Sequence, residues 1–227
     1  MIGCVAIKRS RHHGEVRREG FCNYLKRKSP ALLIEWSNLK CSFDGRTVFE
    51  GFSGSLDAGE RVRVAGPSGC GKTSFLSMLL GFLKPTTGTV SYADDIRALA
   101  SYVPQEADFG MCGTADEWIR RVFSYRRNRG CGVTDAAVAA WLERLRLPPA
   151  VRTTRVASLS GGEKQRIAIA VAALLPRRVI ILDEPFSALD EATARVVADE
   201  LKNLDRAILY TSHVDVAPGF ATREVTL

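Results

Sequence analysis

A glycine-rich stretch in the first third of the chain decides the fold: Gly66-Pro67-Ser68-Gly69-Cys70-Gly71-Lys72-Thr73. It fits the pattern G-x-x-x-x-G-K-[ST] of a phosphate-binding loop. Residues 61–65 before it have the composition of a strand, and residues 74–80 after it have that of a helix. Because the pattern requires this order of strand, loop and helix, the sequence predicts an α/β fold with a P-loop core.

Each residue type in this loop suits the binding of a nucleotide with Mg²⁺. Glycines let backbone N–H groups turn toward the phosphates, and the start of the following helix adds positive potential. Lys72 would reach the β- and γ-phosphates, and Thr73 would offer a hydroxyl to Mg²⁺. An ordinary glycine-rich turn is the alternative, which the flanking strand and helix disfavour. The candidate nucleotide-binding residues are Gly66, Pro67, Ser68, Gly69, Cys70, Gly71, Lys72, Thr73 and Ser74.

A second stretch places a serine and glycines at the start of another predicted helix: Leu159-Ser160-Gly161-Gly162-Glu163. This is the geometry of a second anion site, although a serine helix cap would explain the fragment taken alone. Together the two stretches resemble the ATP-binding-cassette (ABC) ATPases, whose LSGGQ-like signature completes the nucleotide site of a second, facing subunit. The resemblance implies that ATP binds Ser160, Gly161, Gly162 and Glu163, with Glu163 standing in place of the usual glutamine.

Two carboxylates follow the apolar run 179–182. The run predicts a buried parallel strand, whose end would deliver Asp183 to Mg²⁺ and Glu184 to the attacking water. Acidic residues also follow strands as helix caps, which is the alternative. The resemblance favours the catalytic interpretation, because the pair lies downstream of both other motifs in the order of the family.

The resemblance also implies roles for three polar residues in loops. Gln105 would contact both the metal and the water, and His213 resembles the switch that contacts the γ-phosphate. Asp190 lies in a segment like the D-loop, which implies that it contacts the nucleotide. A loop glutamine and a structural histidine are the alternatives. The implied catalytic residues are Glu184, His213, Gln105 and Lys72, and the implied metal ligands are Thr73, Gln105 and Asp183.

Phe43 stands where the family usually has a tyrosine that stacks on adenine. Any flat aromatic ring can stack in this way. A core phenylalanine on an edge strand is the competing interpretation, and the sequence favours the stacking role only slightly.

Basic residues are concentrated near the N-terminus. The net charge is +7, and residues 1–30 hold eight Lys or Arg against Glu15 and Glu19, which accounts for +6 of it. This segment has no sustained period, so we predict a disordered basic tail at 1–30 ahead of one ABC domain at 31–227. A solvated extension is favoured over attraction to anionic lipid, and no nucleic-acid partner is expected.

The remaining composition predicts a chain that does not itself enter a membrane. The longest apolar stretch, 167–175, is too short to cross a bilayer, and the first ten residues lack the pattern of a signal peptide. The six cysteines include no C-x-x-C pair, so neither a zinc site nor a disulfide framework is expected.

The coarse organisation from residue 31 onward resembles that of the ABC family. Strand-like segments at 32–36, 41–43 and 52–56 predict an antiparallel β-subdomain, and helical patterns at 115–125 and 135–145 predict an inserted helical subdomain at about 106–157. In the family, this subdomain forms a groove for a permease. Candidate permease contacts are Phe109, Met111, Thr114, Glu117 and Trp118, with core packing an equal alternative for Trp118.

The resemblance implies an ATP-hydrolysing subunit of an ABC transporter. Two copies, or one copy with a similar chain, would sandwich ATP and drive an integral-membrane permease from the cytoplasmic face of the cell membrane. Few residues follow His213, which suggests the compact single-domain type. The alternative is a soluble ABC ATPase acting on DNA or the ribosome, but the spacing from Lys72 to Ser160 leaves no room for a long coiled coil.

Overall fold

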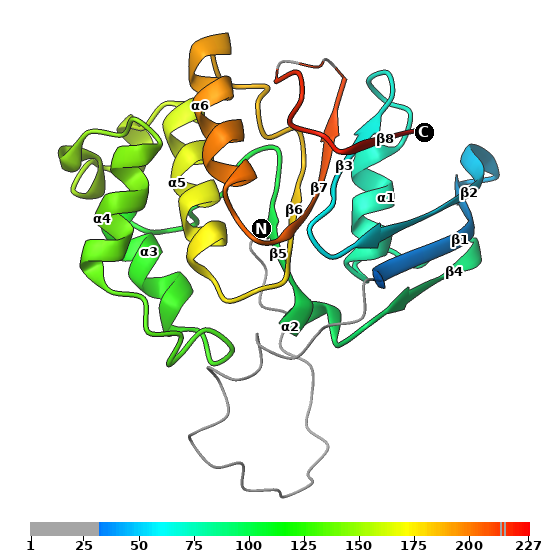
Figure 1. Cartoon of the computed structure of the whole chain (residues 1–227), viewed down its shortest axis with the longest axis horizontal. Helices are drawn as coiled ribbons and strands as arrows, with labels where there is room; N and C mark the ends of the chain where they lie inside the picture. Colours follow the sequence, from blue (N-terminus) through cyan, green and yellow to red (C-terminus); the bar gives the residue numbers. More distant parts are fainter. Residues whose placement is uncertain (1–31, 214, 216) are drawn as a thin grey trace, which may run out of the picture.

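The computed structural model describes residues 32–213, 215 and 217–227, so the predicted basic tail lies outside the described part of the chain. Two sheets and six α-helices form this part (Figure 1). The strands are β1 Leu32–Phe43, β2 Arg46–Asp57, β3 Arg61–Ala65, β4 Thr87–Tyr92, β5 Ala100–Val103, β6 Val179–Leu182, β7 Ala207–Ser212 and β8 Arg223–Thr226. The α-helices are α1 Lys72–Leu79, α2 Ile96–Leu99, α3 Ala115–Ser124, α4 Asp135–Arg144, α5 Gly161–Leu174 and α6 Glu191–Lys202, with 3₁₀ turns at Pro149–Arg152 and Val156–Ser158.

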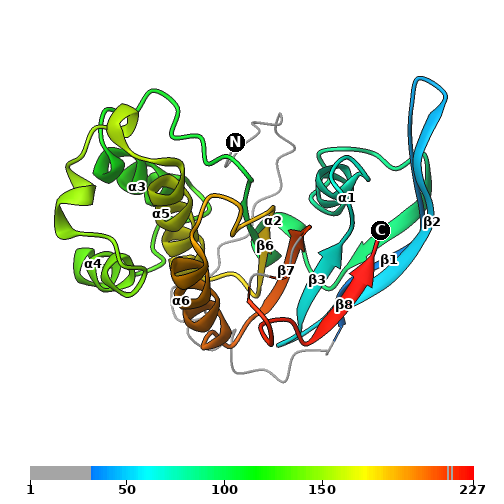
Figure 2. The same ribbon diagram turned by 90° about the horizontal axis from the view of Figure 1, so that it is seen from above.

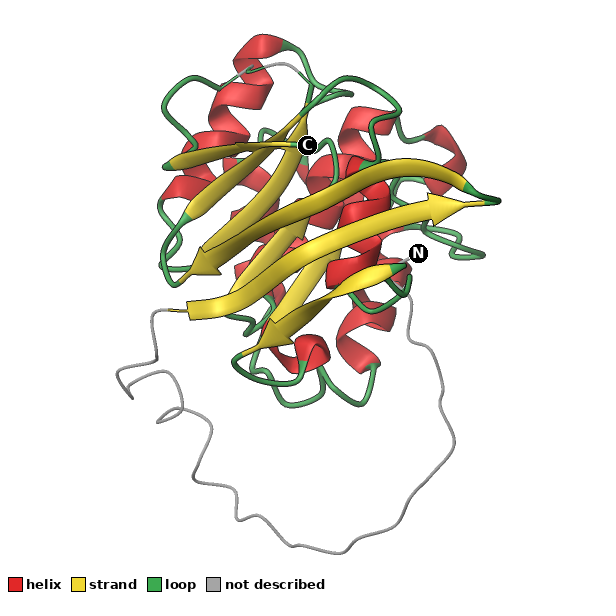
Figure 3. Ribbon diagram, turned by 90° about the vertical axis from the view of Figure 1, so that its right-hand side faces the viewer, coloured by secondary structure: helices red, strands yellow, loops and turns green. Residues whose placement is uncertain are grey.

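The central sheet is parallel and has the strand order β5-β6-β7-β3-β8. The second sheet is antiparallel, in the order β2-β1-β4, and its long strands run along one side of the molecule (Figure 3). Helix α1 lies between the two sheets, whereas α5 and α6 cover the other face of the parallel sheet (Figure 2). This arrangement confirms the predicted α/β fold with a P-loop core and an antiparallel β-subdomain.

Strand β6 shows how the sequence divides the core into two layers. Ile180 and Leu182 pack with the helices α3 to α6, whereas Val179 and Ile181 pack with α1 and the antiparallel sheet. Side chains alternate along a strand, so a run that is apolar at every position must be covered on both faces. The uninterrupted apolar run at 179–182 therefore fixes β6 in the middle of the molecule.

The expectation of two short strands at 32–36 and 41–43 was wrong. A single strand β1 spans both, with irregular register around Ser37 and Asn38. Asn38 has a φ of +49°, and its backbone N–H donates to Ser53 Oγ at 2.8 Å. Asparagine tolerates this left-handed conformation, so the polar residues form a bulge where the sequence pattern indicated a break.

Helices α3 and α4 match the two helices expected in the inserted segment, and they lie together at one side of the molecule (Figure 1). Each begins at a threonine, Thr114 or Thr134, whose hydroxyl accepts a backbone N–H from the first turn. Arg152 pairs with Asp116 on α3 and Asp135 on α4. These contacts join the two helices into one unit attached to α5.

Candidate functional site

The phosphate-binding loop connects β3 to α1 and depends on its glycines. A Cβ at Gly66 would lie 2.6 Å from Cys70 Sγ, and one at Gly71 would lie 2.7 Å from Val48 Cγ1. Gly71 is also the N-cap of α1, with a φ of 105° and no side-chain cap. The first N–H groups of α1 are therefore left for a ligand to satisfy.

Lys72 is buried at the base of this loop. Its Nζ donates to the carbonyls of Gly66 at 2.9 Å and Pro67 at 3.1 Å, and it lies 3.3 Å from Glu184 Oε1. The ammonium group is thus held between loop carbonyls and a carboxylate that follows β6.

Asp183 and Thr73 meet although 110 positions separate them in the sequence. The Thr73 hydroxyl donates to Asp183 Oδ2 at 2.8 Å, and the Asp183 carboxylate is buried. Both groups offer oxygen atoms, which are the ligands that Mg²⁺ prefers. The structure therefore brings together two of the three predicted metal ligands.

Glu184 joins Lys72 to His213. One carboxylate oxygen, Oε1, faces Lys72, and the other, Oε2, lies 3.0 Å from His213 Nδ1. The backbone of Glu184 has a φ of +44°, which a non-glycine residue rarely adopts. Three of the four predicted catalytic residues are therefore in contact, and one of them holds an uncommon backbone conformation.

Gln105, the fourth, follows β5 and has an exposed side chain. Its neighbour Pro104 accepts a hydrogen bond from Gln165 Nε2 on α5 at 3.3 Å, and Val103 accepts one from Asp183 N at 2.9 Å. The loop that carries Gln105 is thus tied to both α5 and the end of β6. The metal role of Gln105 stays a prediction.

The second candidate phosphate-binding end, at α5, has a different local structure. Ser160 is the N-cap, and its hydroxyl accepts Glu163 N at 3.2 Å. Glu163 Oε2 in turn accepts from Ser160 N at 2.8 Å and from the Ser160 hydroxyl at 2.9 Å. These bonds, first that from the Ser160 backbone, lower the pKa of Glu163. Ser160 and Glu163 thus satisfy each other's hydrogen-bonding groups in a capping box that spans four residues.

Gly162 lies close to the loop that follows β6. A Cβ at this position would lie 2.8 Å from the carbonyl oxygen of Ala188, so only glycine fits without movement. Asp190, at the end of this loop, caps α6 by accepting from Thr193 N and Thr193 Oγ1, which lowers its pKa. The side chain of Asp190 is therefore used within the chain, and its predicted contact with nucleotide stays a prediction.

A family model described as ABC transporter matches residues 49–187, which contain the phosphate-binding loop, the second glycine-rich end and both carboxylates after β6. The chain belongs to this family. Its fold is that of an ABC ATPase domain, as in CbiO1 of Clostridium perfringens, part of an ABC transporter complex, with a TM-score of 0.70, 20% identity, and coverage of 87% of this chain and 85% of that one.

Two curated relatives belong to import systems by name. The Fe(3+) ions import ATP-binding protein FbpC 1 of Rhodococcus jostii is 34% identical over 84% of this chain and 58% of the relative. The spermidine/putrescine import ATP-binding protein PotA of Marinobacter nauticus is 34% identical over 78% of this chain and 48% of the relative. The chain thus spans about half the length of these ABC proteins.

Phe43 and Ser74 differ in how well they suit their predicted contacts with nucleotide. The Phe43 side chain is 47% exposed beside the hairpin turn Asp44-Gly45, which contradicts a core role and leaves its ring free to stack. Ser74 instead directs its hydroxyl to the Cys41 thiol. The backbone N–H of Ser74 still lies in the first turn of α1, where it can contribute to an ABC phosphate site.

Two of the candidate permease contacts belong to the core. Phe109 and Trp118 are buried and stack with ring centroids 4.3 Å apart, so the interpretation of Phe109 as a surface contact was wrong. Two large rings release more free energy by packing on each other than by facing water. Thr114 and Glu117 accept backbone hydrogen bonds at the start of α3, whereas Met111 is 96% exposed.

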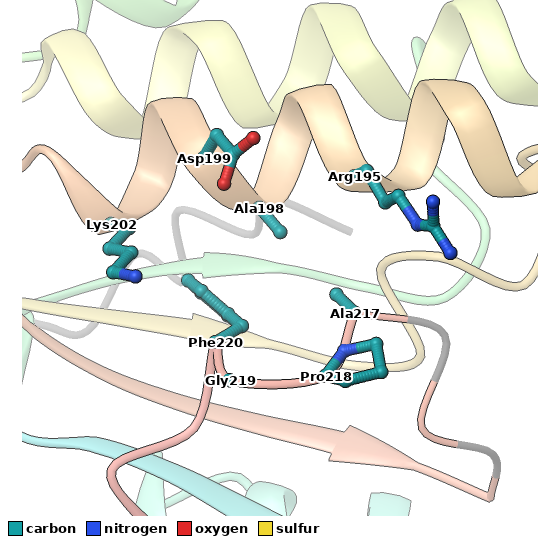
Figure 4. A pocket seen from close by; sticks show the side chains of 8 residues that line it. All are labelled: Arg195, Ala198, Asp199, Lys202, Ala217, Pro218, Gly219 and Phe220. Carbon is teal, nitrogen blue, oxygen red and sulfur yellow. The ribbon is translucent and has the colours of Figure 1, made fainter.

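A hollow of about 250 Å³ lies between α6 and the segment 217–220 (Figure 4). Charged side chains of α6, Arg195, Asp199 and Lys202, line one side of it, and Phe220 faces them. None of its lining residues belongs to the nucleotide site described above. This hollow is therefore separate from the ABC nucleotide site.

Two polar residues that hold the site were not among the predicted site residues. Gln165 is buried on α5 and contacts the Gln105 loop, and Thr211 is buried on β7 and contacts Asp183. Thr211 could have been identified from the sequence, because a hydroxyl group in a buried, mostly apolar strand needs a hydrogen-bond partner.

Proposed function

We propose that the chain binds and hydrolyses ATP as the energising subunit of an ABC transporter. The observation that carries the proposal is the contact of Thr73 with Asp183, beside the linked side chains of Lys72, Glu184 and His213. The side chains that would bind phosphate, metal and water thus come from the ends of three strands and lie together. Their chemistry matches the parts needed for phosphoryl transfer.

The Mg²⁺ that would accompany ATP fits the oxygen donors of Thr73 and Asp183. The Thr73 hydroxyl uses its hydrogen toward Asp183, which leaves its lone pairs free for a cation. A carboxylate and a hydroxyl are suitable ligands for this hard ion. When bound, Mg²⁺ neutralises charge on the β- and γ-phosphates.

Hydrolysis would require Lys72 and Glu184 to separate, so that Lys72 can bind phosphate and Glu184 can bind water. A triphosphate is a stronger partner for the Lys72 ammonium than the carbonyls of Gly66 and Pro67. Once Lys72 contacts phosphate, Glu184 Oε1 becomes available to orient water. His213, at Oε2, keeps the carboxylate in place.

Two chains would share each nucleotide. Helices α1 and α5 lie on opposite faces of the parallel sheet (Figure 2), and Ser160 is exposed. This separation supports a site in which the P-loop of one chain meets Ser160, Gly161 and Gly162 of another. The second chain would be a further copy or a similar ATPase.

An integral-membrane permease is the partner that this function requires. The assignment of the two relatives to import systems supports this class of partner, and exposed Met111 beside α3 is a candidate contact. In the described part of the chain, no helix has the length and apolar character to cross a membrane. From the import systems of these relatives, we propose that the chain works at the cytoplasmic face of the membrane through its permease.

The test is Mg²⁺-dependent ATP hydrolysis by the purified full chain. Lys72→Ala removes charge-assisted bonds to phosphate, so ATP binding should weaken by at least about tenfold and phosphate release should disappear. Lys84→Ala, at an exposed lysine after α1, is the matched control and should behave as wild type. Absence of Mg²⁺-dependent hydrolysis in the wild type, or full activity in Lys72→Ala, would contradict the proposed function.

A further inference from the structure

Thr211 occupies a central position in the parallel sheet. Its strand β7 pairs with β6 on one side and with β3 on the other, and Thr211 is in register with Val64. β6 leads into Asp183 and Glu184, and β3 leads into the phosphate-binding loop. The Thr211 side chain is 0% exposed. A hydroxyl buried at this point must find its partners among the groups of the site.

The hydroxyl of Thr211 makes two hydrogen bonds, one as donor and one as acceptor. It donates to Asp183 Oδ1 at 2.6 Å and accepts from Glu184 N at 2.9 Å. The other oxygen of Asp183, Oδ2, accepts from Thr73. Because each carboxylate oxygen has its own hydroxyl donor, rotation of the Asp183 carboxylate would disrupt both bonds.

The second bond holds a backbone conformation that is otherwise unfavourable. Glu184 has a φ of +44°, and such a conformation persists only where surrounding contacts enforce it. Its N–H would be a buried donor without a partner if the Thr211 hydroxyl were removed. The direction in which the Glu184 side chain leaves the backbone, toward Lys72 and His213, depends on this conformation.

We propose that Thr211 is a positioning residue for both carboxylates: its hydroxyl orients Asp183 toward the metal and fixes the backbone from which Glu184 reaches water. The inference rests on the proposed function, since it assigns Asp183 to Mg²⁺ and Glu184 to water. Thr211 itself would contact neither the metal nor the water. Its influence should therefore appear in the affinity for the metal and in the rate, but not in metal-free binding of nucleotide.

The experiment compares Thr211→Ala with Thr211→Ser in the full chain, because these two variants differ only by the hydroxyl. Mn²⁺ binding in the presence of a non-hydrolysable ATP analogue is followed by electron paramagnetic resonance, and the Mg²⁺ dependence of ATP hydrolysis is measured in parallel. Metal-free binding of a fluorescent ATP analogue in EDTA reports the integrity of the phosphate loop. Ser101→Ala, which removes another buried hydroxyl from the same sheet, is the matched control.

Thr211→Ala should raise the half-saturating Mn²⁺ and Mg²⁺ concentrations by about 10- to 100-fold and lower the maximal rate, as expected when a group that orients a metal ligand is lost. Thr211→Ser loses only a methyl group and should stay within about threefold of wild type. Ser101→Ala should lower the unfolding temperature without changing the metal requirement. Metal-free nucleotide binding should be unchanged in all three variants.

Several results would overturn the inference. Thr211→Ala could bind Mn²⁺ as tightly as wild type, Thr211→Ser could lose as much as Thr211→Ala, or metal-free binding could fall in step with metal affinity, which would indicate a structural role only. If Thr211→Ala does not fold, Thr211→Val, which keeps the branched shape, takes its place with the same expectations. A wild-type chain that binds no Mn²⁺ with nucleotide would instead contradict the proposed function.

Discussion

The two helix ends that could bind phosphate, at α1 and α5, differ in what already satisfies them. α1 begins at Gly71 without a side-chain cap, and Lys72 beside it is buried and linked to residues from distant parts of the chain. α5 begins at exposed Ser160, whose hydrogen bonds are closed by Glu163 one turn later. The first end has free amide donors, whereas the second has a cap of its own.

This difference indicates how the ABC site would assemble. The α1 end has free N–H donors and a buried cation, so it can bind phosphate within one chain. At α5 a phosphate must compete with Glu163 for the Ser160 hydroxyl. We therefore expect α1 to bind nucleotide first, and α5 to contribute only when a second chain brings a bound phosphate to it.

The largest effect is expected from Glu184→Gln, which tests the α1 end, where Glu184 contacts Lys72. The variant keeps the shape of the side chain but removes the charge that orients water, so hydrolysis should fall by about 100-fold or more. ATP binding should persist, because Lys72 and the loop are intact, and a dimer should accumulate with ATP. Phosphate release and gel filtration measure the two effects.

Glu143→Gln, at an exposed carboxylate on α4, is the control for this variant and should hydrolyse ATP at the wild-type rate. If Glu184→Gln also kept the wild-type rate, Glu184 would not act on water, and its contacts with Lys72 and His213 would be structural.

The next prediction tests whether the two ends act in different chains. Ser160→Arg should block the α5 end, and Lys72→Ala should disable the α1 end, so neither pure dimer has an intact site. A mixed dimer has one site with both changes and one with neither. An equal mixture should recover about a quarter of wild-type ATPase activity if the two sites work independently in a symmetric dimer.

The control for mixing is a chain that carries both Ser160→Arg and Lys72→Ala, combined with Lys72→Ala chains. No dimer in this mixture has an intact site, so no activity should return. Recovery in the control, or none in the first mixture although mixed dimers form, would argue against sites shared in this way. Activity in pure Ser160→Arg protein would reject the role of the α5 end.

The same contrast explains how far the sequence could predict the molecule. Local patterns located the loop before α1, the cap of α5 and the buried strand β6, because spacing and side-chain period are encoded within a few residues. They did not reveal that Thr211 holds Asp183, since that contact depends on the strand order β6-β7-β3. No local period records which strands become neighbours.

Surface contacts were predicted less well for a related reason. Phe109 and Trp118 stack on each other in the helical subdomain, and only the packing of α3 shows that their rings face inward. β1 continues through Asn38 because a partner strand supplies Ser53 to the bulge. In both places a tertiary contact decides between interpretations that the sequence pattern leaves open.

The smallest effect is expected from Glu163→Gln, which tests the self-contained cap of α5. Glu163 uses one oxygen, Oε2, to accept both hydrogen bonds from Ser160, and a glutamine carbonyl oxygen can accept the same two. The cap should therefore survive, and loss of the negative charge from the helix N-terminus should cost only about 0.3–1 kcal/mol of stability.

The charge of Glu163 should matter more for the partner chain than for folding. Its pKa is lowered by hydrogen bonds from Ser160, so the carboxylate is ionised at neutral pH and would repel an approaching phosphate. With Glu163→Gln, the ATP concentration needed for dimerisation should fall about two- to fivefold. Added salt should reduce this effect, because the neighbouring residues Ser160 and Gly161 are exposed to solvent. Sedimentation across a range of ATP concentrations measures this, with Glu191→Gln in the first turn of α6 as the control. Weaker dimerisation of Glu163→Gln would show that the carboxylate supports the α5 end, and that the contrast between the two ends is smaller than the structure suggests.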